Sequence, residues 1–117
     1  AGKWSLKEML LHITDTERIF SYRALRIARN DNTPLPGFDE KSFAVAGNAD
    51  TRSWENLFEE FEAVRRSTDL LLASFTEEQL SLVGTTNNQP TSVGAICFVI
   101  YGHILHHINI TKERYLH

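Results

Sequence analysis

Cysteine is nearly absent from this chain of 117 residues, because Cys97 is the only one. A single thiol cannot form an internal disulfide, and this fits a protein of the reducing cytoplasm. No signal peptide is visible at the N-terminus, which agrees with a cytoplasmic location. Cys97 stands in the apolar run 93–100, so we expect a buried and unreactive thiol rather than a nucleophile.

An excess of basic residues is also lacking. Lysine and arginine number 12 against 15 aspartates and glutamates, so the formal net charge is −3. A nucleic-acid binder would normally present a basic face, and we therefore expect no nucleic-acid partner. Arg23, Arg26 and Arg29 recur at every third position. We interpret them as a solvated or salt-bridged stripe on a helix, with an anion-binding edge as the alternative.

Motifs that would identify a substrate are missing too. The sequence contains no glycine-rich phosphate loop, no nucleophile elbow and no paired-cysteine motif. Residues 93–110 carry no fixed charge and reach the lower length limit of a membrane span. Three histidines, Asn109 and two glycines in this stretch would be costly in lipid. We therefore expect no membrane partner and read the stretch as a central helix of a small bundle.

Helical patterns dominate the chain, and no segment shows a convincing strand pattern. The first predicted helix covers residues 5–30, where Ser5 and Glu8 form a capping box and no glycine or proline interrupts the apolar spacing. Two more long helices are predicted over residues 51–74 and 91–115. The remaining predictions are a helical turn at 39–45, a short turn opened by the capping box of Thr76 and Gln79, and a polar loop at 83–90.

These elements predict an all-α protein, a helical bundle folded as a single domain over residues 1–117. The helix at 91–115 is apolar nearly all round, so we expect it to be the most buried element. Three helices cover such a helix poorly. A fourth helix is therefore expected, either before Ala1 or from a second chain.

The connection at residues 31–50 is unusually long for a compact domain, and such loops are often functional. It contains Phe38 and Phe43. We expect these rings to pack over the bundle as a lid.

Histidines form the main candidate site. His103 and His107 are four residues apart, so a helix places them on one face, one turn apart. His12 could join them if its helix packs antiparallel alongside. Three imidazoles from two helices can hold a transition metal and leave coordination positions open, which is typical of catalytic sites. The alternative is three hydrogen-bonded core histidines without a metal.

Two further residues are candidates for a role beside this triad. Asp15 follows His12 by three positions and could orient a ligand histidine or act as a catalytic base. An ordinary ion pair with Arg18 is the alternative reading of Asp15. His106 points away from the His103 and His107 face on a helical wheel, so we expect it to support the site or lie on the surface.

Two sequence motifs resemble the DinB-like (DinB/YfiT) superfamily. The first lies in residues 2–18, where Trp4, Ser5 and His12 match the pattern W-S-x-K-E-x-x-x-H-x-x-D. The second lies in residues 102–107, which match G-H-x-x-H-H. The resemblance covers nearly the whole chain, and the two motifs combined are more specific than either histidine pattern alone.

The resemblance implies an up-down four-helix bundle, usually dimeric, in which His12, His103 and His107 are the metal ligands. Nickel or zinc is the metal it implies first. Some relatives are thiol transferases that use a low-molecular-weight thiol, and others are isomerases or hydrolases. We therefore expect a metal-dependent thiol transferase that forms a homodimer. A hydrolase, and a non-catalytic metal-binding or dimerisation module in stress response, are the alternatives.

One feature departs from the family pattern. The family has a helix before the Trp-Ser segment, and this helix is missing from the sequence. The three expected ligands remain, but we expect one wall of the pocket to be lost.

Overall fold

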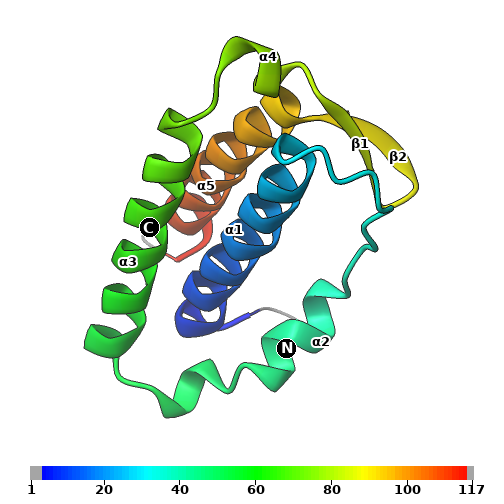
Figure 1. The fold of residues 1–117 in the computed structure, drawn as a ribbon. Coiled ribbons are helices and arrows are strands. Elements are labelled where there is room, and N and C mark those ends of the chain that lie inside the picture. The colour runs from blue at the N-terminus through cyan, green and yellow to red at the C-terminus, as the bar shows by residue number, and fades with distance from the viewer. Residues whose placement is uncertain (1–3, 116–117) are drawn as a thin grey trace.

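The computed structural model describes residues 4–115 and consists mainly of helices (Figure 1). The three long helices are α1 (Leu6–Ala28), α3 (Trp54–Ala73) and α5 (Val93–Tyr115), as the sequence predicted. Shorter elements connect them: α2 (Glu40–Ala46), the 3₁₀ helix η1 (Ala49–Thr51), α4 (Glu77–Leu80), β1 (Val83–Thr86) and β2 (Gln89–Ser92). The prediction of an all-α bundle is confirmed, with one small hairpin added.

Both predicted capping boxes are present. The Ser5 side chain accepts a hydrogen bond from the backbone N–H of Glu8, and the Glu8 carboxylate accepts one from the backbone N–H of Ser5. Thr76 and Gln79 make the same reciprocal pair at the start of α4. These bonds satisfy amides that the first turn of a helix leaves without partners, so they fix where each helix begins.

The prediction of a polar loop at 83–90 is wrong, because β1 and β2 pair there as an antiparallel hairpin. Asn87 and Asn88 form its turn with φ values of 49° and 65°. A two-residue hairpin turn with positive φ at both positions matches the right-handed twist of the strands, and asparagine tolerates this backbone region. Leu35 bridges to Thr86 beside the hairpin, so the segment after α1 is tied to it.

Helix α1 is the centre of the structure and packs along both α3 and α5, whereas α3 and α5 share few contacts (Figure 1). α1 and α3 run in the same direction, because the connection through α2 and η1 returns the chain to the N-terminal end of α1. α5 runs antiparallel to α1. Simple up-down alternation is thus broken by the long connection.

The prediction that the last helix is the most buried element is wrong for the described residues. One face of α5 packs on α1 through Val93, Ile96 and Ile100, which are at most 4% exposed. On another face Phe98 and Leu105 are 81% and 61% exposed. The apolar pattern indicated that this helix packs against neighbours on several sides. In the described chain, however, one of its faces stays exposed.

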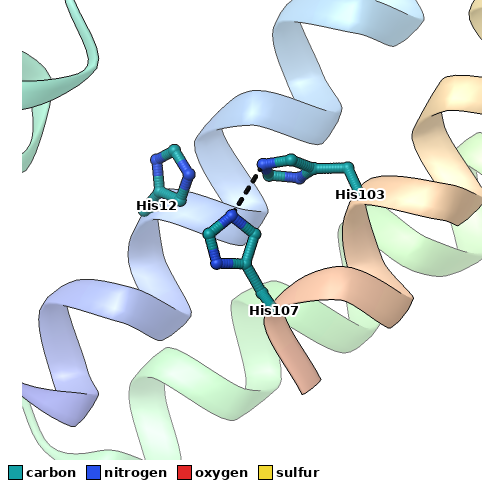
Figure 2. Close-up of side chains that lie close together, drawn as sticks. All are labelled: His12, His103 and His107. Carbon is teal, nitrogen blue, oxygen red and sulfur yellow. Dashed lines mark hydrogen bonds between the residues drawn. The ribbon is translucent and has the colours of Figure 1, made fainter. Parts of the chain in front are cut away.

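By length and composition alone, the segment Val93–Glu113 of α5 would be able to cross a membrane, and it is the only helix among the described residues of which this is true. Core helices of soluble bundles have the same composition. His103 and His107, which lie on α5, are directed toward α1 rather than outward (Figure 2).

Candidate metal centre

Two antiparallel helices bring the three predicted ligands together. His12 lies in the N-terminal half of α1, and His103 and His107 lie on successive turns in the middle of α5. Figure 2 shows the three rings close together beside α1, with His103 and His107 reaching toward it from α5. One ring nitrogen from each residue lies within 4.8 Å of the other two.

The three rings are in mutual contact. The ring centroids of His103 and His107 are 4.3 Å apart, and the His12 ring lies 5.2 Å from the first and 4.8 Å from the second. The Nε2 atoms of His103 and His107 are 2.9 Å apart (Figure 2). Three imidazoles this close repel one another when charged, so their surroundings favour the neutral form.

Burial is the main cause that keeps these imidazoles neutral. His12 is only 5% exposed, and the other two are half-buried. Burial, with a smaller contribution from neighbouring histidines, lowers the pKa of His12, His103 and His107 to about 4. At neutral pH each ring therefore offers a lone pair, which is the form that binds a metal.

This donor set fits a divalent transition metal. Nitrogen ligands bind zinc at about 2.0–2.1 Å, so ligands in a tetrahedral site stand roughly 3.3 Å apart. The distances between the ring nitrogens need only small rotamer changes to meet that spacing. Nδ1 of His107 is buried and has no hydrogen-bond partner among the described residues. This nitrogen is not the one that faces His103, because the Nε2 atoms of the two rings face each other.

Other side chains orient the triad. The Trp4 ring lies 4.6 Å from the His12 ring, and Thr16 Oγ1 lies 3.5 Å from His12 Nδ1. Phe20 contacts His103, with 6.4 Å between ring centroids. The sequence patterns predicted no contact between these three residues and the histidines. For Trp4, its place in the same motif as His12 was the feature that could have indicated such a contact.

The structure does not bring Asp15 into the triad. Its carboxyl group lies near Glu60, Arg18 and Arg52, and its pKa is raised first by burial and then by Glu60. Asp15 makes no contact with the three histidines among the described residues, so its catalytic role stays a prediction. His106 is exposed, and its ring contacts that of His107 at 5.3 Å.

The predicted lid residues lie together. The rings of Phe38 and Phe43 are 5.0 Å apart. Phe38 also lies 6.0 Å from the guanidinium of Arg23 on α1. The long connection is therefore anchored to α1 through an aromatic and cationic contact.

Known proteins agree with this architecture. YfiT from Bacillus subtilis, described as a probable metal-dependent hydrolase with an unusual four-helix bundle topology, superimposes with a TM-score of 0.75 and 14% sequence identity. The match covers 96% of this chain and 67% of YfiT. No curated protein sequence matches. The family model of the DinB superfamily matches residues 1–110. The chain therefore belongs to the DinB superfamily.

Proposed function

We propose that this chain is a divalent-metal-dependent enzyme in which His12, His103 and His107 hold the ion. The observation that carries the proposal is the convergence of three ring nitrogens within 4.8 Å on two helices. Three protein ligands leave coordination positions for a substrate, as in catalytic metal sites. A bound divalent cation would lower the pKa of a coordinated thiol or water and so supply a nucleophile at neutral pH.

The residues of the site favour a thiol over water as that nucleophile. A free thiol has a pKa near 8.5 and that of water is near 15.7, so water needs far more help to lose its proton. Hydrolytic sites often supply a carboxylate as the general base. No carboxylate joins the three histidines among the described residues. We therefore propose transfer of a low-molecular-weight thiol to an electrophile, with nickel or zinc as the metal.

Side chains around the triad hold the imidazole rings in place and limit the access of water to them. Trp4 and Thr16 hold the His12 ring, and Phe20 covers one side of His103. The apolar surroundings of the rings weaken competition from water and keep the histidines unprotonated. Substrate would reach the triad from the side of α1 on which Phe38 and Phe43 lie.

Hydrolysis is the second candidate. It is favoured by the description of YfiT, which shares this fold, as a probable metal-dependent hydrolase. A hydrolytic reaction would need a base, and Asp15 would have to turn from its present neighbours Arg18 and Arg52.

Two assays on one preparation separate the candidates. The zinc- or nickel-loaded protein is mixed with monochlorobimane and 2-mercaptoethanol, which form a fluorescent thioether with release of chloride and a proton. In parallel it is mixed with a nitrophenyl ester without thiol. We expect metal-dependent thioether formation that is lost in His103→Ala and retained in His106→Ala. Ester cleavage without thioether formation would favour hydrolysis, and neither reaction with a loaded metal would contradict both.

A further inference from the structure

Arg23 has an unusual environment for an arginine. Its side chain extends from the C-terminal part of α1, and the residue is only 7% exposed. The guanidinium carbon lies 5.3 Å from the Phe20 ring centroid and 6.0 Å from that of Phe38. Nη2 donates a hydrogen bond to the backbone carbonyl of Pro36 at 2.7 Å. The cation is thus held between two aromatic rings and fixed by one neutral acceptor.

No carboxylate compensates this charge among the residues that the structure describes. The neighbouring arginines behave differently. Arg26 pairs with Asp31 at 2.6 Å, and Arg29 is exposed. A guanidinium has five N–H donors, and Arg23 uses one of them in the 2.7 Å hydrogen bond to the Pro36 carbonyl. A buried cation without a counterion is costly unless an anion completes it.

Arg23 lines a small cavity. Each guanidinium nitrogen of Arg23 either has a hydrogen-bond partner or is accessible to solvent. The cavity has a volume of about 190 Å³ and is lined by Phe20, Arg23, Thr86, Thr91, Ile96 and Val99. It therefore lies between α1, α5 and the hairpin. Its size suits one arm of a ligand rather than a whole drug-sized molecule.

This cavity adjoins the candidate metal centre. Phe20 lines the cavity and also contacts the His103 ring at 6.4 Å. Val99 lines it from α5, one helical turn before His103. A molecule with one end among the histidines could therefore place its other end against Arg23, passing along Phe20.

We propose that Arg23 is a specificity-determining residue that binds a carboxylate of the substrate in this cavity while the reactive end of the substrate lies at the histidine triad. This assignment deepens the proposed function and rests on it for the reactive end. Guanidinium and carboxylate match as planar partners that can form two parallel hydrogen bonds. Arg23 is the only charged residue lining the cavity, beside two hydroxyls and three apolar side chains. Such a lining suits a single negative charge on a short apolar arm better than a doubly charged phosphate.

Butyrate and butyramide provide the test, because they differ in charge and hardly in shape. Each is titrated at constant ionic strength into the ¹⁵N-labelled, metal-free protein, and the Arg23 Nε–H and the Thr86 and Thr91 amides are followed by NMR. We expect saturable shifts with butyrate and none with butyramide. Equal responses to both molecules, or butyrate shifts confined to other arginines, would overturn the proposal.

Matched variants sharpen this result. Arg23→Gln removes the charge but keeps a donor for Pro36, and we expect it to weaken butyrate binding by about tenfold or more. Arg29→Gln removes the same charge from the exposed residue that follows α1 and should bind butyrate like the parent. Unchanged binding in Arg23→Gln would contradict the assignment. If that variant fails to fold, the comparison of butyrate with butyramide in the parent still decides.

The metal content is measured on the same samples, so the two proposals fail separately. Butyrate binding without metal binding would remove the proposed enzyme function and leave an anion site. Metal binding with no preference for butyrate would keep the function and remove the role of Arg23.

Discussion

The imidazoles of His12, His103 and His107 contribute to the response of the metal-free protein to mild acid. Burial lowers the pKa of each to about 4 in the folded state, whereas an unfolded histidine titrates near 6.5. Between these values the unfolded state binds protons that the folded state does not. The free energy of unfolding therefore falls as the pH drops from about 6.5 to about 4. Above that range the three histidines cause no loss of stability.

This gives a prediction for three substitutions made together. In chelator-treated protein we expect the variant His12→Asn, His103→Asn, His107→Asn to lose less stability than the parent when the pH is lowered from about 7 to about 5. Urea unfolding at the two pH values measures the difference. His106→Asn, at an exposed position, is the control and should keep the parent's pH dependence. Identical pH dependence in parent and triple variant would mean that the triad is not the source.

The convergence of His12, His103 and His107 was predictable from spacing and from the family resemblance, but the environment of Arg23 was not. Arg23, Arg26 and Arg29 are equivalent in the sequence. They differ only once the segment after α1 folds back, so that Pro36 and Phe38 cover Arg23 while Asp31 pairs with Arg26. The difference between these arginines comes from contacts with the segment after α1, and the local sequence pattern does not predict those contacts.

At the scale of elements, a buried ion pair joins α1 to α3. Glu17 Oε2 on α1 lies 3.0 Å from Nη1 of Arg65 on α3, and the Glu17 side chain is 2% exposed. Arg65 also pairs with Asp69, whose carboxylate accepts a hydrogen bond from Tyr101 on α5. Because α3 and α5 have few other contacts, these polar groups are a main link between the two helices.

Removing one partner of this pair should destabilise the protein strongly. We expect Arg65→Met to lower the free energy of unfolding by about 3 kcal/mol, because Glu17 would remain buried without a counterion. Arg66→Met, on the exposed side of the same helix, should change it by less than about 0.5 kcal/mol. Urea denaturation measures both variants.

A double variant distinguishes an uncompensated charge from lost packing. Adding Glu17→Gln to Arg65→Met should recover much of the lost stability, because no buried charge is then left alone. If the double variant is no more stable than Arg65→Met, the ion pair is not the cause.

The long helices were predictable because their signals are local. The capping boxes at Ser5 and Thr76 mark helix starts, and residues 5–30 contain no helix breaker. The hairpin was missed because its strands have four residues each, too few for alternation to stand out. Its turn uses Asn87 and Asn88 rather than the Asn-Gly pair that signals such a turn most strongly.

At the scale of the whole molecule, α5 exposes a row of large apolar side chains on the face that points away from α1. Phe98, Tyr101, Leu105 and Ile108 are all more than two-fifths exposed. Their spacing of three, four and three residues puts them on one stripe, like the seam of a helix pair. Large exposed apolar patches usually mark an interaction surface. The sequence could show that this helix needs neighbours, but not which neighbours the described chain provides.

We expect two copies of this chain to associate through that stripe as a homodimer. Sedimentation velocity over a range of concentrations should show a dimer for the parent and a monomer for Phe98→Glu combined with Leu105→Glu. Val83→Glu, at an exposed apolar position on β1, is the control and should remain dimeric. A parent that is monomeric at all concentrations would contradict this expectation.

Metal content shows directly whether the three histidines form one metal site. The measurement is elemental analysis of protein purified without a histidine tag and reconstituted with zinc or nickel, beside His103→Ala and His106→Ala. We predict about one equivalent of metal in the parent and in His106→Ala, and little in His103→Ala, because one of three ligands is lost. Equal metal in all three proteins, or none in the reconstituted parent, would contradict the assignment of these histidines as ligands.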